Sequence, residues 1–121
     1  MKILIINPNT SESMTDKIRE VATAVKRHDC ELTVICPDRG PITIESSYDE
    51  AYAIAPTIDL VKKASKEDYD AIILACFCDV GVDAAKEIST VPVLGLEEAT
   101  LSVAILLGDK FGIMTETVSY T

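Results

Sequence analysis

The chain has 121 residues, of which 48% are hydrophobic and 26% charged, and its formal net charge at pH 7 is −9. This length allows one compact domain of ordinary size, and the composition is typical of a soluble globular protein. Binding to nucleic acid or to an anionic membrane requires a basic surface, so the charge argues against both kinds of partner. No apolar run approaches the ~20 residues that span a bilayer, and the N-terminus lacks the cleavage pattern of a secretion signal. We therefore expect a cytoplasmic protein.

Short apolar runs alternate with longer segments of helical periodicity, a pattern typical of βαβ units and a parallel sheet. It predicts strands near residues 2–6, 31–36, 70–75, 91–94 and 111–115. Apolar spacing predicts helices over 12–27, around 52–61, over 79–88 and over 97–107. Thr10 or Ser11 should cap the first helix, and Gly108 should end the last. The predicted fold class is α/β, with helices on both faces of a parallel sheet.

Cys76 follows the apolar run 71–75, where a short loop leads toward a predicted helix. The carboxyl ends of parallel strands are where α/β sheets hold their reactive groups. A helix N-terminus lowers the pKa of a nearby thiol, so we expect the Cys76 thiolate to form below the ~8.5 of free cysteine. Alternatively, Cys76 packs as a small buried hydrophobe, as unpaired cysteines commonly do.

Other polar residues should meet Cys76 at the same edge of the sheet. Asn7 and Asn9 follow the first predicted strand, and Thr115 ends the fifth. Polar residues at strand ends are often only turn formers or caps, so each could serve structure rather than binding. The segment 7–11 has neither a G-x-G-x-x-G nor a G-K-[ST] pattern, which argues against nucleotide binding.

The cysteines do not form a metal-binding pattern. They lie at positions 30, 36, 76 and 78, without paired C-x-x-C spacing, and the single histidine is His28. A zinc site is therefore not expected, and no metal is assigned. The C-x-C pair at 76 and 78 leaves a thiol redox module as one alternative, although this spacing is uncommon for redox catalysis.

Four motifs cover nearly the whole chain and point to one family. They are IINPNTS at 5–11, GPITIES at 40–46, DAIILACF at 70–77 and PVLGLEEA at 92–99. In this order and spacing they resemble the aspartate/glutamate/hydantoin racemase superfamily, and within it the hydantoin racemase branch. The resemblance implies a flavodoxin-like α/β lobe that pairs with a second lobe around a cleft, and a reaction that needs no cofactor.

The resemblance also implies roles for individual residues. Cys76 would face one side of the substrate's Cα as acid or base, and a cysteine of the second lobe would face the other. Inversion requires both, because the proton leaves from one face and returns to the opposite face. Phe77 and Cys78 would offer backbone amides to the enolate-like intermediate, and Asn7, Asn9 and Thr115 would orient the substrate. The implied substrate is a hydantoin, a ureide or an acidic amino acid.

The chain departs from the family pattern in its loop and in its length. It has Asp79-Val80-Gly81 where members often have Asp-Pro-Gly, and Cys78 where a small or acidic residue is common. By this resemblance residues 1–95 are one lobe, residues 96–121 begin a second, and the enzyme is incomplete. We therefore expect a homo-oligomer formed through 97–121. The competing interpretation is a non-catalytic α/β domain that binds a small ligand or a protein.

Overall fold

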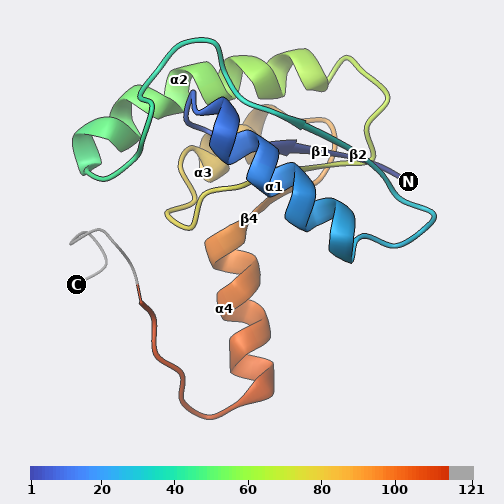
Figure 1. The fold of residues 1–121 in the computed structure, drawn as a ribbon, viewed down its shortest axis with the longest axis vertical. Coiled ribbons are helices and arrows are strands. Elements are labelled where there is room, and N and C mark those ends of the chain that lie inside the picture. The colour runs from blue at the N-terminus through green and yellow to red at the C-terminus, as the bar shows by residue number, and fades with distance from the viewer. Residues whose placement is uncertain (115–121) are drawn as a thin grey trace.

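A computed structural model describes residues 1–114 of the chain. Helices and strands alternate along it, in the order β1 (Lys2–Ile6), α1 (Glu12–Val25), β2 (Glu31–Ile35), α2 (Ser47–Ala64), β3 (Ala71–Leu74), α3 (Val82–Ile88), β4 (Val93–Gly95) and α4 (Leu96–Leu107) (Figure 1). The strands form one sheet in the order β2-β1-β3-β4, and every pairing is parallel. The predicted α/β class and its first four strands are confirmed.

The register brings the carboxyl ends of the strands together at one edge. Ile6 of β1 pairs with Ile35 of β2 and with Leu74 of β3, and Leu74 pairs with Gly95 of β4. The segments that follow β1, β3 and β4 therefore begin side by side. This edge holds the loop after β1, the Cys76 loop after β3 and the start of α4.

One face of the sheet carries the main hydrophobic core. Alternate side chains of the strands point to it and pack against α2 and α3, because successive residues of a strand face opposite sides. The core residues that are buried there are Leu4, Ile6, Val61, Ala64, Ile72, Leu74, Val82, Ala85 and Val93. This layer of aliphatic side chains fixes the strand ends on which the loops are built.

The other face is covered by α1, which packs against β2 (Figure 1). Ser11 caps this helix, as predicted, because its hydroxyl accepts a hydrogen bond from the Met14 amide at 3.2 Å. Beside α1 an apolar groove of about 450 Å³ remains over the middle of the sheet. It is lined by Ile5, Met14, Lys17, Ile18, Val21, Ala22, Ile73, Ala75 and Leu96.

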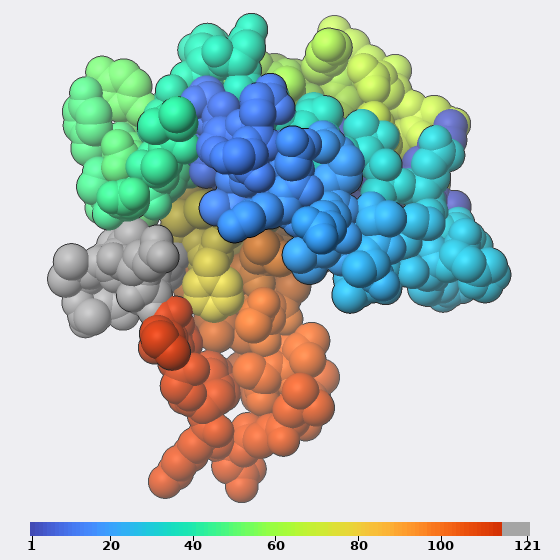
Figure 2. All heavy atoms as spheres, viewed as in Figure 1, coloured from blue at the N-terminus to red at the C-terminus, as the bar shows by residue number. Residues whose placement is uncertain are grey.

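Helix α4 projects away from the sheet (Figures 1 and 2). It ends at Gly108, as predicted, and none of its twelve residues is buried. The prediction of a strand near 111–115 is wrong for residues 111–114, which have no regular secondary structure. Their apolar pattern suits a strand, but α4 carries them away from the sheet edge, where a strand would find its partner.

All four helices differ from the predicted bounds, and the second and third differ most. The third begins at Val82 rather than at 79, because Cys76 to Asp79 form a turn before it. The second runs further than 52–61 and starts after Ser46, whose hydroxyl accepts a hydrogen bond from the Asp49 amide at 3.3 Å. Within the described residues, no helix combines the length and the apolar character needed to cross a bilayer.

Candidate functional site

A cavity of about 380 Å³ opens at the carboxyl ends of β1 and β3. It is lined by Asn7, Asn9, Ser11, Met14, Ile18, Ile42, Thr43, Ile44, Glu45, Ala75 and Cys76. The volume suits a small ligand. Three of the residues predicted for the site, Asn7, Asn9 and Cys76, therefore line one cavity, although they come from two separate strand ends.

The loop between β1 and α1 is held by the side chain of Asn7, which is only 1% exposed. Its amide nitrogen donates hydrogen bonds to Asn9 Oδ1 at 2.8 Å and to Thr15 Oγ1 at 3.0 Å. Asn9 Oδ1 also accepts from the Ser11 amide at 2.9 Å. The amide nitrogen of Asn7 is thus engaged within the loop, and Asn9 and Ser11 extend from it along the cavity wall.

A second loop forms the opposite wall and is tied to the first. Both the amide and the hydroxyl of Thr10 donate to the Pro41 carbonyl, at 2.9 and 3.3 Å. The residues that follow, 42–45, line the cavity. The GPITIES motif is therefore part of the site, because its wall is anchored on the loop that carries Asn7 and Asn9.

Cys76 begins a tight turn that brings it against Cys78. The Asp79 amide donates to the Cys76 carbonyl at 3.0 Å, which closes the turn. Within it the Sγ atoms of Cys76 and Cys78 lie 3.0 Å apart and share a hydrogen bond. Both side chains are partly buried thiols, and Cys76, which lines the cavity, is in contact with the sulfur atom of Cys78 behind it in the turn.

The pKa of the Cys76 thiol is raised, contrary to the prediction from the helix dipole. The largest cause is the hydrogen bond with Cys78, followed by burial of the thiol. The helix that was expected to lower the pKa begins only at Val82, beyond the turn. Since the dipole acts within the first turn of a helix, the contact and the burial dominate. Cys76 is therefore protonated at neutral pH in this form of the protein.

Glu50 influences Cys76, although sequence reasoning assigned it no role in the site. Its negative charge contributes to the raised pKa of Cys76. One of its carboxylate oxygens, Oε1, is buried and has no hydrogen-bond partner among the described residues. In the sequence Glu50 looks like an ordinary acidic residue in the first turn of α2, where it suits the helix dipole. The one hint was its place four positions after the end of the GPITIES motif.

Asp79 connects the cysteine turn to α4. Its carboxylate accepts hydrogen bonds from the amides of Glu97 at 2.9 Å and of Glu98 at 2.8 Å. These amides belong to the first turn of α4, whose N-cap residue, Gly95, has no side chain to satisfy them. Asp79 also adopts a positive φ of 47°. The turn that holds Cys76 is therefore fixed at its far end by a helix.

The charges near the cavity do not suggest a metal or a strongly anionic ligand. Glu45 is the charged residue among those that line it. In the described part of the chain, no group of three or more histidine, cysteine, aspartate or glutamate residues could hold a metal ion. The lining thus offers amide, hydroxyl and thiol groups to a small polar molecule.

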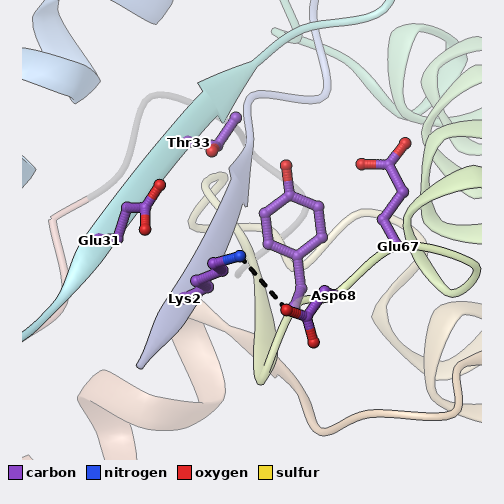
Figure 3. A pocket seen from close by; sticks show the side chains of 6 residues that line it. Lys2, Glu31, Thr33, Glu67 and Asp68 are labelled. Carbon is purple, nitrogen blue, oxygen red and sulfur yellow. Dashed lines mark hydrogen bonds and ion pairs between the residues drawn. The ribbon is translucent and has the colours of Figure 1, made fainter.

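A smaller hollow of about 180 Å³ lies at the opposite, amino-terminal edge of the sheet (Figure 3). It is charged and open, and the Lys2 ammonium points toward the Asp68 carboxylate, with Nζ 3.3 Å from Oδ2. This contact raises the pKa of Lys2. Because α/β sheets place their reactive groups at the carboxyl ends of strands, the Cys76 cavity is the better candidate.

Two groups of predicted site residues remain predictions. Phe77 and Cys78 lie in the turn after Cys76, next to the cavity, and their amides could reach a ligand there. Thr115 lies outside the described residues.

Comparison with known proteins shows which family the chain resembles. A model of the family described as Asp/Glu/Hydantoin racemase matches residues 3–119. A hydantoin racemase from Pseudomonas sp. (strain NS671) is 39% identical over 115 residues, covering 95% of this chain and 46% of the relative. A hydantoin racemase from Paenarthrobacter aurescens is 39% identical over 116 residues, covering 95% of this chain and 49% of the relative. The chain spans about half the length of these relatives.

A solved structure shares the same fold. The allantoin racemase from Klebsiella pneumoniae superposes with a TM-score of 0.84 and 36% sequence identity, covering 88% of this chain and 43% of that chain. The sheet and helices described above are thus those of about half of that structure.

Proposed function

Because this chain belongs to the Asp/Glu/hydantoin racemase family, we propose that it supplies one of the two catalytic faces of a cofactor-independent racemase. Cys76 is the group that exchanges a proton with the substrate's Cα. The observation that carries the proposal is that Cys76, Asn7 and Asn9 line one cavity of ligand size at the carboxyl ends of two neighbouring strands. We also propose that residues 1–95 form the lobe that carries Cys76 and that residues 96–121 begin the second lobe.

The protonation state of Cys76 sets its role in each direction of the reaction. Its raised pKa favours the thiol over the thiolate. A protonated Cys76 donates to the intermediate after a base on the opposite face has removed the Cα proton. For the other enantiomer Cys76 has to be the base, and its proton then leaves before the reaction. Backbone amides of Phe77 and Cys78 stabilise the oxyanion that develops between these two steps.

The lining of the cavity favours a neutral substrate over an acidic amino acid. A dicarboxylic substrate needs cationic side chains, whereas the lining contributes the carboxylate of Glu45. The carbonyl and N–H groups of a hydantoin or a ureide such as allantoin match the amide and hydroxyl groups of Asn9, Ser11 and Thr43. The names of the relatives, hydantoin and allantoin racemases, agree with this choice.

The test compares the chain alone with a chimera in which it is joined to the second half of the Paenarthrobacter hydantoin racemase. Loss of optical rotation of single enantiomers of a 5-substituted hydantoin and of allantoin reports racemisation. We expect none from these 121 residues alone, because the proposal assigns them only one of the two groups that exchange a proton with Cα, and we expect turnover by the chimera. Cys76→Ser should abolish that turnover, whereas Cys36→Ser, a cysteine outside the cavity lining, should preserve it. Full activity of the Cys76→Ser chimera would refute the proposed role.

We also infer that the chain self-associates through α4. None of the residues of this helix is buried, and Val103, Ile105, Leu106 and Leu107 are all more than half exposed. Residues 103–107, the last turn and more of α4, are all apolar, and a helical segment that is apolar on every side is normally enclosed by protein. A twofold contact with the same helix of a second copy would cover both helices in one self-complementary interface. This proposal is independent of the chemistry of Cys76.

A further inference from the structure

We propose that Cys76 and Cys78 are a site of reversible oxidation, at which a hydroperoxide converts the two thiols into a disulfide. The observation that carries this inference is the 3.0 Å separation of their Sγ atoms. A disulfide bond is about 2.05 Å long, so the sulfur atoms need to approach by only about 1 Å. The inference goes beyond racemisation and does not depend on it.

The turn holds the two sulfur atoms in place before any oxidant arrives. The hydrogen bond from the Asp79 amide to the Cys76 carbonyl closes the backbone at 3.0 Å around Cys78. The Asp79 side chain anchors the end of this turn through the amides of Glu97 and Glu98. Because the backbone of the turn is already ordered, formation of the disulfide bond costs little additional conformational entropy.

The oxidation can be written with all atoms accounted for. One of the two thiols gives up its proton and, as the thiolate, attacks the terminal oxygen of the hydroperoxide. The O–O bond breaks, the terminal oxygen stays on sulfur as a sulfenic acid, and the leaving alkoxide or hydroxide takes up the released proton to become an alcohol or water. The neighbouring thiol then attacks the sulfenic sulfur, a S–S bond forms, and water leaves with the second thiol's proton. Two thiols are oxidised by two electrons, and one hydroperoxide is reduced. A dithiol such as dithiothreitol reverses the process.

The other two cysteines are a built-in control. Cys30 precedes β2 and Cys36 follows it, so the five residues of the strand hold their Cα atoms about 20 Å apart. They cannot form a disulfide in the folded protein. The chain therefore contains one pair of cysteines that is positioned to oxidise together and one pair that the sheet keeps apart.

Trypsin separates these two pairs onto different peptides. Cleavage after Lys66 and Lys86 releases peptide 67–86, which contains Cys76 and Cys78, and cleavage after Arg27 and Arg39 releases peptide 28–39, which contains Cys30 and Cys36. The folded chain is treated with hydrogen peroxide, and the remaining thiols are blocked with N-ethylmaleimide before digestion. Mass spectrometry then shows which peptide has lost two hydrogens and has escaped alkylation.

We expect peptide 67–86 to lose two hydrogens about ten-fold faster than peptide 28–39 is modified at all, because its second thiol is held in contact. Dithiothreitol should restore alkylation of both Cys76 and Cys78. In Cys78→Ser, the same peptide should instead carry a sulfenic acid on Cys76 that dimedone traps. Cys36→Ser should leave the oxidation of peptide 67–86 unchanged.

Three outcomes would overturn the proposal. Peptide 67–86 could remain fully alkylated while peptide 28–39 is modified, Cys76 could link to a second chain rather than to Cys78, or Cys78→Ser could lose two hydrogens like the parent. None of these readings uses racemase activity. In the racemising chimera the same treatment should remove activity that dithiothreitol restores. Failure of that arm alone would count against the role of Cys76 in catalysis and not against the disulfide.

Discussion

The carboxylate of Asp79 occupies the space that a side chain at Gly95 would fill. A Cβ built on Gly95 overlaps the carboxylate carbon and both carboxylate oxygens of Asp79. The φ of Gly95 is −92°, a value that any residue adopts, so the requirement for glycine is spatial and not conformational. The N-cap residue of α4 has no side chain, and the Asp79 carboxylate caps the helix in its place. Asp79 belongs to the turn after β3, which also carries Cys76.

Gly95→Ala should destabilise the protein by about 1–3 kcal/mol, because the methyl group displaces the Asp79 carboxylate from the amides of α4. Urea unfolding followed by circular dichroism measures the change. The same substitution is then made in Asp79→Ala. That variant loses the cap of α4, which lowers the free energy of unfolding by about 1–2 kcal/mol, but it also frees the space beside Gly95. Adding Gly95→Ala to that background should cost almost nothing. Additive effects of the two substitutions would show that the residues are not coupled in this way.

Cys78→Ala should lower the pKa of Cys76, because contact with Cys78 is the largest cause of its elevation. The rate of iodoacetamide alkylation at Cys76, followed by peptide mass mapping across the pH range, reports this value. At neutral pH the variant should react at least about ten-fold faster than the parent, which corresponds to a shift of one pKa unit. Glu50→Gln should shift the profile in the same direction by less. An unchanged profile in Cys78→Ala would mean that burial alone holds the proton.

Asn7→Leu should destabilise the fold by about 1–3 kcal/mol, since Asn9, Thr15 and the loop backbone would lose a buried donor. The control is Asn9→Ala, which lies closer to the surface and should cost less. Thermal unfolding of both variants separates the two roles. If Asn9→Ala destabilised the protein more than Asn7→Leu, the loop would not be organised around Asn7.

The start of α4 should weaken in acid through Glu98. The side chain of Lys86, and next the Gly95 amide, hold the pKa of Glu98 below its usual value. The stabilisation is therefore complete above the pKa of an unfolded glutamate, about 4.3, and is lost as the pH falls through the lower native value. Glu98→Gln should reduce the loss of stability between about pH 5 and pH 3.

Glu97 is the matched control for Glu98, because its pKa is shifted the other way. Burial, and next the charge of Asp79, raise the pKa of Glu97. Protonation of Glu97 therefore favours the folded state as the pH falls, and Glu97→Gln should leave the loss of stability in acid larger than in the parent. Equal acid profiles for the two variants, measured by urea unfolding, would contradict the assignment of both shifts.

Leu106→Glu should convert an associating chain into a monomer. Leu106 is 83% exposed, so a charge introduced there should leave the folded monomer intact and disrupt only a contact with another copy. Light scattering at several concentrations measures the mass of parent and variant. Val25→Glu, at the end of α1 and 79% exposed, introduces the same charge elsewhere and should leave the mass of the parent unchanged. A parent chain that stays monomeric at high concentration would refute self-association through α4.

The sequence was sufficient to predict what local patterns control. Apolar runs bounded by polar turns predicted the first four strands, and Ser11 predicted the start of α1. Both signals can be read from the sequence because strand periodicity and helix capping depend on residues close together in the chain. The wrong fifth strand shows the limit of such patterns. Residues 111–114 have strand-like composition, yet a strand requires a partner, and the direction of α4 removes them from it.

The site was predictable as a location but not as an environment. Parallel topology alone placed Cys76 beside Asn7 and Asn9. The raised pKa of Cys76 depends on the hydrogen bond with Cys78, on burial and, least, on the charge of Glu50 in α2. The sequence shows that Cys78 is near, but not that the turn closed by the Asp79 amide brings the two sulfur atoms into contact. The same holds for the match between Asp79 and Gly95, which are sixteen positions apart in the chain.

In the β1–α1 loop, the backbone N–H groups determine which side-chain amide atoms donate hydrogen bonds and which accept them. The Ser11 N–H can only donate, so the atom of Asn9 that faces it must be the side-chain oxygen. The Asn9 N–H likewise faces Asn7 Oδ1, at 3.4 Å, which turns the amino group of Asn7 toward Asn9 and Thr15. With its oxygen committed, the side chain of Asn9 has its NH₂ group left to offer the cavity. We therefore expect this corner of the candidate site to favour a ligand's hydrogen-bond acceptor, such as a carbonyl oxygen, over a donor.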